Sequence, residues 1–277
     1  EGVGEVVSDP SGKFQPGEKV VMVPNMAVET NEFIAENYLR SSKFCGSSMD
    51  GFLQEYVSIS PERLVRLPQG IDMNVAAFTE IVSVSVHAIS RFDKIAHACR
   101  RRIGVWGDGN LGYITSLFIK KMFPETTLYV FGTSAEKLSD FTFADETVLV
   151  NEIPEEMWVD HAFECVGGNG SPVAIEQIIA TVKPEAAVSI LGVSEYPVPI
   201  NTRMILEKGL RFFGSSRSGV KDFEKTVEMY EKYPEITDYL GNIISSVNTV
   251  RSIADIKAAF EKDTQKAFGK TIMVWEE

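Results

Sequence analysis

The sequence contains few cysteines and histidines and no long hydrophobic run. Its three cysteines are widely separated, with no C-x-x-C pair, so a four-cysteine zinc clip is excluded, and sparse thiols are typical of a reducing cytoplasm. The three histidines have no metal-ligand spacing, and we expect them to be structural or exposed. The residues concerned are Cys45, Cys99, Cys165, His87, His97 and His161. No apolar segment approaches the roughly 18 residues of a membrane span, and no signal peptide opens the sequence. We therefore expect a cytoplasmic protein with no membrane partner.

Positive charge is also scarce, because 27 lysines and arginines face 39 acidic residues and the net charge is −12. Polyanions bind basic surfaces, so this balance argues against nucleic acid as a partner. A small anionic ligand needs only a local group of donors and is not excluded. Hydrophobic residues make up 44% of the 277 residues, which is ordinary for a globular protein of one or two domains.

The first seventy residues are rich in strand signals separated by turn formers such as "DPSG" and "QPGE". The segment 25–50 is longer and irregular. The pattern predicts a small β domain with one excursion loop. The expected strands are 1–7, 19–24, 52–60 and 64–68.

Strands and helices alternate from Arg102 onward, after one or two expected helices in 73–92. Continuous apolar strands that alternate with helices predict a parallel sheet buried on both faces. The expected strands are 102–107, 127–132, 146–151, 161–167, 186–193 and 210–216. The expected helices between them include 112–123, 171–182 and 202–209. The tail adds a predicted helix over 252–265 and a last strand over 270–277.

The stretch "VWGDGNLG" has the G-x-G-x-x-G spacing of a dinucleotide-binding turn. It follows a predicted strand and opens a predicted helix whose apolar residues recur every three or four positions. Glycines at these places allow a tight turn, close approach of a pyrophosphate, and close helix–strand packing. The helix N-terminus offers N–H groups to the anion. The alternative is a glycine turn that binds no nucleotide. The predicted coenzyme residues here are Gly107, Gly109, Asn110, Leu111 and Gly112.

The next strand, within "LYVFGTSAEKL", ends without the acid that binds the adenosine ribose of NAD. Thr133 and Ser134 offer hydroxyls instead, and Lys137 adds a positive charge. A carboxylate repels the extra phosphate of NADP, whereas hydroxyls and a cation favour it. We predict NADP as the cofactor. The alternative is that Lys137 only pairs with Glu136 or solvent.

The chain resembles the medium-chain, zinc-type alcohol and polyol dehydrogenases over essentially its whole length. The segments that carry the resemblance are "EGVGEVV", "FQPGEKVVMVP", "GFLQEYVSI" and "GKTIMV". Within this family, "NEFIAENYLRSSKF" followed by "DGFLQEY" is most similar to ribulose-5-phosphate reductases. The resemblance implies an α/β fold, with a doubly wound parallel (Rossmann) sheet and a mainly β GroES-like catalytic domain. The implied domains are 1–75, 76–240 and a return to the catalytic domain over 241–277.

The resemblance implies reduction of ribulose 5-phosphate to ribitol 5-phosphate by NADPH, with zinc-assisted hydride transfer. The product would serve CDP-ribitol and teichoic-acid-type polymer synthesis, and relatives are homodimers or homotetramers. The sequence starts at the Glu of the family's Gly-His-Glu signature, so we expect a chain that lacks N-terminal residues and that by itself is inactive. The loop 25–50 contains one cysteine, so no structural zinc is expected.

The resemblance also assigns site residues. Glu1 and Glu80 match metal positions of the family, and Glu80 is the predicted catalytic residue. The sequence departs from many relatives at Ile81, where they have a proline. The alternative for Glu80 is an acid that is stabilised by the dipole at a helix N-terminus and binds no metal. Lys270 matches a basic residue near the pyrophosphate, or is only a surface charge. Residues that line the nicotinamide and pyrophosphate would be Cys165, Val166, Gly167, Leu191, Gly192 and Val193, followed by Ser215 and Ser216. Arg40 and Lys43 are candidates for a sugar phosphate.

Three alternatives stay open on the sequence. One is another zinc-type polyol or alcohol dehydrogenase. The second is a zinc-free quinone reductase of the same fold, which would lack an acid at position 80. The third is a non-catalytic NADPH-binding protein.

Overall fold

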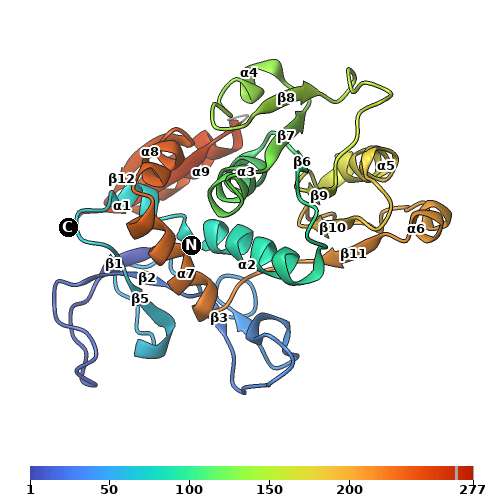
Figure 1. Cartoon of the computed structure of the whole chain (residues 1–277). Helices are drawn as coiled ribbons and strands as arrows, with labels where there is room; N and C mark the ends of the chain where they lie inside the picture. Colours follow the sequence, from blue (N-terminus) through green and yellow to red (C-terminus); the bar gives the residue numbers. More distant parts are fainter. Residues whose placement is uncertain (266–267, 277) are drawn as a thin grey trace. The chain divides into compact units, whose positions relative to one another are not determined.

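The computed structural model describes residues 1–265 and 268–276. Its contacts divide the chain into unit 1, Glu1–Val84 with Arg217–Glu277, and unit 2, Ser85–Ser216 (Figure 1). Helix α2 (Thr79–Ile95) runs across the first boundary. This division differs from the predicted limits of the nucleotide domain, since the chain returns to unit 1 before residue 240.

Unit 2 is built on a six-stranded sheet in which every pairing is parallel. The strand order is β11-β10-β9-β6-β7-β8. The first strand in the chain thus lies beside the fourth, which is the doubly wound order predicted for this region. The strands are β6 (Arg102–Trp106), β7 (Thr127–Gly132), β8 (Glu146–Leu149), β9 (His161–Glu164), β10 (Ala187–Ile190) and β11 (Arg211–Gly214).

Helices cover both faces of this sheet (Figure 1). On one face, α5 and α6 bury apolar side chains against the strands, and Ile175 and Ile178 of α5 share a core with Phe131 and Val188. Helix α3 packs against β6 and β7. Removal of this apolar surface from water is the main stabilisation of the unit. The helices are α3 (Asn110–Met122), α4 (Ala135–Leu138), α5 (Ser171–Thr181) and α6 (Thr202–Lys208), with a 3-10 turn η3 (Gly168–Gly170).

Unit 1 begins as the predicted small β domain. Strands β1 (Val3–Glu5), β2 (Lys19–Met22) and β5 (Leu64–Arg66) form an antiparallel sheet in the order β1-β2-β5. The excursion loop contains a short antiparallel pair, β3 (Asn25–Met26) and β4 (Lys43–Phe44). Two 3-10 turns and a short helix complete this part of the chain. They are η1 (Glu36–Tyr38), η2 (Pro61–Arg63) and α1 (Met73–Ala76).

The C-terminal part of unit 1 is a helical segment followed by a β-α-β unit. Helix α7 (Val220–Lys232) places Phe223 and Val227 in a core with Val21 and Val65 of the sheet, which explains why this helix belongs to unit 1. Strands β12 and β13 pair in parallel, with α9 between them in the chain. The remaining elements are α8 (Glu235–Gly241), β12 (Ile244–Val250), α9 (Ile253–Gln265) and β13 (Lys270–Trp275).

Some sequence predictions of elements were wrong. Residues 52–60 form no strand, because no neighbouring strand in the described part of the chain pairs with them and most of their side chains are exposed. Helices α7 and α8 and strand β12 were not predicted. Glu277, at the end of the predicted last strand, lies outside the described residues.

None of the helices in residues 1–265 and 268–276 combines the length and hydrophobicity that a bilayer span requires.

Candidate active site and coenzyme site

The glycine-rich turn connects β6 to α3 at the point where the strand order of the sheet reverses, between β6 and β9. Gly107 has a φ of +135°, which favours glycine, and an added Cβ there would lie 2.9 Å from the backbone of Cys165. At Gly112 an added Cβ would lie 1.9 Å from the carbonyl oxygen of Gly107. Both positions therefore require glycine on steric grounds, as a dinucleotide turn does.

Gly109 has a different character, since an added Cβ would meet no atom of the described residues within 4 Å. It is the N-cap of α3 and makes no side-chain capping bond. Asn110 and Leu111 form the first helical positions and are half-buried. The open space at Gly109 and the N-terminus of a 13-residue helix form a suitable place for a pyrophosphate.

One buried carboxylate organises the two loops predicted to face the nicotinamide. Glu164 ends β9 and is fully buried. Its Oε1 accepts hydrogen bonds from the N–H groups of Val166 and Gly167 at 3.0 and 2.9 Å, and its Oε2 accepts from Gly192 at 3.0 Å. These hydrogen bonds offset the cost of removing the carboxylate from water. Because the same side chain bonds to both loops, it also holds the loops side by side.

The side chains of these loops are not equivalent. Leu191 and Cys165 are buried, whereas Val166 is 43% and Val193 84% exposed. Burial raises the pKa of the Cys165 thiol far above its usual range, although the Thr115 hydroxyl bonds to it. The thiol is therefore protonated and not a nucleophile. The exposed valines are the loop side chains available to a ligand.

At the end of β7 the structure places an acid that the sequence analysis did not consider. Asp108 Oδ2 accepts hydrogen bonds from the N–H of Thr133 at 2.6 Å, from its hydroxyl at 3.1 Å, and from the N–H of Ser134 at 2.9 Å. Gly132 makes room for it, because an added Cβ would lie 2.7 Å from the Asp108 Cβ. The end of β7 therefore has no acid of its own, but Asp108 from the glycine-rich turn lies against it.

The other predicted groups at this end lie on the short helix α4. The Ser134 hydroxyl caps this helix by accepting the N–H of Lys137 at 3.3 Å. The ammonium of Lys137 forms no ion pair with Glu136 or with any other carboxylate in the described part of the chain. Lys137 is therefore available to a phosphate next to the helix N-terminus.

Sequence reasoning missed Asp108 and Glu164 for the same reason. It searched for an acid after β7 and for loop residues after β9, whereas these two acids act on backbone N–H groups of neighbouring segments. The signal available for Asp108 was an acid inside the glycine motif itself. For Glu164 it was a lone acid within the apolar run "HAFECVG".

Unit 1 brings together the predicted metal residues. Glu80 lies in the first turn of α2. Burial, together with repulsion from the Glu1 carboxylate, raises the pKa of its carboxyl to about 7, although the nearby Lys270 ammonium acts to lower it. Lys270, predicted near the pyrophosphate, forms an ion pair with Glu1 at 2.8 Å in this structure. The three side chains thus form one charged cluster.

The donor chemistry of this cluster fits part of a zinc site. Two neighbouring carboxylates repel one another, a dication neutralises them, and zinc accepts carboxylate oxygen. Among residues 1–265 and 268–276, however, no group of three or more His, Cys, Asp or Glu could hold a metal. The described residues therefore do not form a complete zinc site, because catalytic zinc usually has three protein ligands.

The remaining candidates are dispersed. Ser215 is buried, and its hydroxyl has no hydrogen-bond partner among the described residues, whereas Ser216 is exposed. Arg40 and Lys43 are exposed in the excursion loop. His87 and His161 are buried and His97 is half-buried, with its ring 4.3 Å from that of His161. The three cysteines are free, and Cys45 is half-buried.

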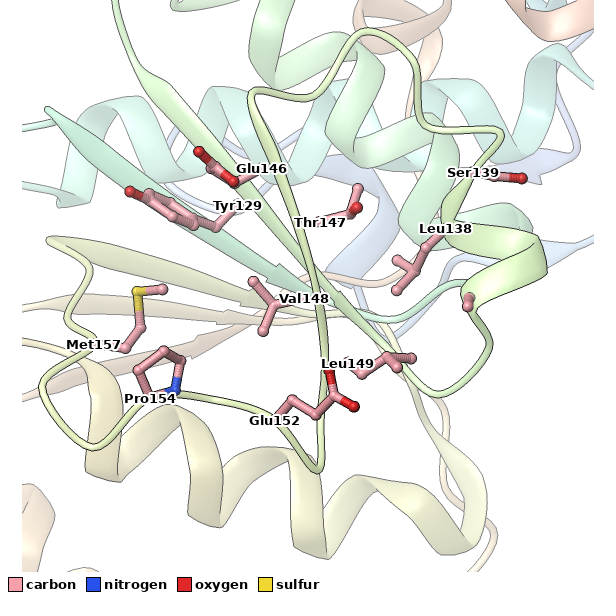
Figure 2. Close-up of a pocket in the computed structure, with 11 residues that line it drawn as sticks. Tyr129, Leu138, Ser139, Glu146, Thr147, Val148, Leu149, Glu152, Pro154 and Met157 are labelled. Carbon is pink, nitrogen blue, oxygen red and sulfur yellow. The ribbon is translucent and has the colours of Figure 1, made fainter.

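A hollow of about 630 Å³ lies elsewhere in unit 2, beside the edge strand β8 (Figure 2). Tyr129, Val148 and Met157 line it together with residues of α4 and of the loop after β8. None of the predicted coenzyme residues lines this hollow. The site of the chemistry is therefore assigned from the turn and the loops, and not from the size of a cavity.

Known proteins similar to this chain agree with these features. No family model matches it. It is 54% identical over 276 residues to the ribulose-5-phosphate reductase of Bacillus spizizenii, covering 100% of this chain and 81% of that protein. It is 50% identical over 275 residues to ribulose-5-phosphate reductase 2 of Staphylococcus aureus, covering 99% of this chain and 81% of the relative. The crystal structure of S. aureus TarJ in complex with NADPH matches with a TM-score of 0.88 and 45% identity, covering 99% of this chain and 80% of that one.

The doubly wound sheet and the glycine turn at its switch point define a dinucleotide-dependent oxidoreductase of the medium-chain type. Within that class, the chain belongs to the ribulose-5-phosphate reductase family. The predictions of fold class, enzyme class and family are confirmed.

Proposed function

We propose that the protein reduces ribulose 5-phosphate to ribitol 5-phosphate with NADPH. The observation that carries the proposal is identity of 43% to 54% with reductases of that name, over practically the whole chain. Independent support comes from the turn at Gly109, which leaves room for a phosphate, and from Lys137 of unit 2, which forms no ion pair with any described residue. The NADPH bound by TarJ, which is 45% identical, supports the same coenzyme.

The reaction balances with one coenzyme and one proton. The nicotinamide ring of NADPH delivers hydride to the ketone carbon, a proton adds to the ketone oxygen, and NADP⁺ leaves. In this proposal the turn at Gly109 binds the pyrophosphate, Lys137 binds the adenosine phosphate, and the loops held by Glu164 orient the nicotinamide. Orientation lowers the barrier because it replaces a chance encounter by a fixed geometry.

We further propose that Glu1 and Glu80 belong to a zinc site. Zinc, when bound, polarises a ketone oxygen and stabilises the developing alkoxide. The support in this structure is the raised pKa of Glu80, since a largely buried acid beside a second acid is stabilised by a cation. The cytoplasmic location, a homodimer or homotetramer, and use of the product for CDP-ribitol and teichoic-acid-type polymers remain expectations.

The test is NADPH oxidation by the full-length protein with ribulose 5-phosphate, other ketose phosphates and simple ketones, measured with and without a zinc chelator. We expect the highest kcat/KM with ribulose 5-phosphate, and loss of activity on chelation with recovery on adding zinc. A higher kcat/KM with another ketone would contradict the substrate. A rate that stays unchanged in metal-free protein, checked by elemental analysis, would contradict the zinc site.

A further inference from the structure

We propose that Arg217 binds the phosphate group of the ketose substrate. The inference deepens the proposed function and rests on it, because it assumes a phosphorylated ketone. Arg217 lies in unit 1, three residues before α7, and had no role in the sequence analysis.

The backbone at Arg217 is in an unfavourable conformation. Its φ is +58°, a region that side chains other than glycine rarely adopt. Among the described residues, Glu185 is the other non-glycine residue with positive φ, and its carboxylate forms an ion pair with Arg211 of unit 2 at 2.9 Å. Strained residues persist where the surroundings over-determine them, and they concentrate at binding sites.

The side chain of Arg217 stacks on an aromatic ring, and no carboxylate of the described residues neutralises its positive charge. Its guanidinium lies over the ring of Phe44, 5.1 Å from the centroid. In the described part of the chain it has no carboxylate within ion-pair distance. In a chain with a net charge of −12, an exposed guanidinium that stacks on an aromatic ring and lacks an acidic partner is available to an external anion.

Hydrogen bonds tie the neighbour of Arg217 to the helical turn that starts at Glu80. The hydroxyls of Ser218 and Ser83 are 2.7 Å apart, and both side chains are buried. The Ser83 hydroxyl in turn donates to the carbonyl oxygen of Glu80 at 2.6 Å. These bonds fix the strained residue relative to the predicted catalytic acid, within unit 1.

This arrangement suits a short ketose phosphate. Three carbons separate the ketone of ribulose 5-phosphate from its phosphate oxygen, so the groups that bind the two ends must lie near one another. The planar guanidinium can donate two parallel hydrogen bonds to a phosphate. Lys43, the earlier candidate, precedes Phe44 in β4, and successive side chains of a strand point to opposite faces. The stacking on Phe44 therefore favours Arg217 over Lys43.

The experiment compares phosphorylated and unphosphorylated substrates in the full-length protein. Arg217→Gln removes the charge. Arg217→Gly removes the side chain but suits the positive φ, so any effect it has cannot come from added strain. Arg66→Gln is the control for loss of a stacked arginine elsewhere in unit 1, because the Arg66 guanidinium lies 4.4 Å from the ring centroid of Phe14 but forms an ion pair with Glu18 at 3.3 Å.

We expect both Arg217 variants to raise the KM for ribulose 5-phosphate by about ten- to a hundredfold, the range of a lost charge-assisted hydrogen bond. The kcat/KM for unphosphorylated ribulose and the KM for NADPH should stay within about twofold of wild type, a change worth under half a kcal/mol. Arg66→Gln should leave all three unchanged.

Arg217 variants that keep the wild-type preference for the phosphorylated ketose would overturn the inference while the proposed function stands. A general loss with both substrates would also overturn it, since that pattern indicates a structural role. A wild-type protein that does not prefer ribulose 5-phosphate over ribulose would instead contradict the substrate itself.

Discussion

The choice of coenzyme is decided by a few side chains around the end of β7. Lys137 offers an ammonium without an ion-pair partner in the described part of the chain, whereas the Thr133 and Ser134 N–H groups already bond to Asp108. A phosphate that binds here shares these donors with a carboxylate, so the positive charge of Lys137 is the main contribution that separates NADPH from NADH.

Lys137→Ala tests this contribution. We expect the KM for NADPH to rise by about tenfold, as for loss of one charge-assisted bond, with little change in the KM for NADH. Lys94→Ala, at an exposed position late in α2, is the control and should change neither. Steady-state kinetics with both coenzymes give the answer, and an equal effect on NADH would mean that Lys137 contacts a group common to both.

At this scale the sequence identified types of residue better than their partners. The absence of an acid at Gly132 and the presence of Lys137 were readable from spacing. The bonds from Asp108 were not, because they join residues about 25 positions apart through a turn whose geometry depends on packing.

The glycine turn and α3 work as one element. Gly107 and Gly112 are in contact with neighbouring backbone, whereas Gly109 faces open space. Gly107 and Gly112 therefore allow close packing, and Gly109 leaves room for a ligand. The same motif thus separates a stability function from a binding function, residue by residue.

Substitution by alanine distinguishes the two functions. Gly112→Ala places a methyl group 1.9 Å from a carbonyl oxygen, and we expect it to lower the free energy of unfolding by about 2 kcal/mol or more. Gly109→Ala, with φ at −91°, should leave stability nearly unchanged but raise the dissociation constant for NADPH at least about tenfold. Chemical denaturation and fluorescence titration measure the two effects. Equal NADPH affinity in Gly109→Ala and wild type would place the pyrophosphate elsewhere.

Elements with a strong repeat were predictable and isolated ones were not. The α/β alternation from Arg102 was recognised because each strand is buried by helices that are close in sequence. The segment 52–60 has strand-like residues, but pairing decides whether a strand forms. Helix α7 was missed although its apolar residues recur at helical spacing, and its buried face includes Phe223 and Val227.

For the molecule as a whole, acid sensitivity follows from groups held in one protonation state. Burial lowers the pKa of His161 to about 4, and its Nδ1 accepts the N–H of Ala187 at 3.0 Å. At Asp160, burial acts to raise the pKa, but hydrogen bonds from Arg102 and Lys183 outweigh it and hold the pKa below its usual value. Both groups bind protons more readily in the unfolded chain.

The free energy of unfolding should therefore fall as the pH is lowered. For His161 the stabilisation is complete above the unfolded value of about 6.5 and is lost as the pH approaches 4, a contribution on the order of 3 kcal/mol. His161→Asn keeps an acceptor for Ala187 and cannot titrate, so its stability should depend less on pH between about 6.5 and 4. Urea denaturation at a series of pH values tests this. Parallel curves for variant and wild type would show that His161 is not held neutral.

The predicted fold class of the whole molecule was confirmed, but the boundaries of its two units were harder to predict from the sequence. Composition and alternation indicated a Rossmann sheet and a β domain. The assignment of α7 to unit 1 depends on a hydrophobic contact with β2 and β5, which lie more than 150 positions earlier. The charged cluster of Glu1, Glu80 and Lys270 brings together residues from both ends of the sequence. These residues were singled out only through the family resemblance.

The double attachment of Glu164 has a consequence for protein engineering. The loops after β9 and β10 are attached to the same carboxylate, so they cannot be redesigned as independent parts. The exposed side chains of Val166 and Val193 can be varied to accommodate modified nicotinamides, because the backbone beneath them is anchored from within. A library that randomises position 164 would release both loops at once and would yield mostly misfolded variants instead of new specificities.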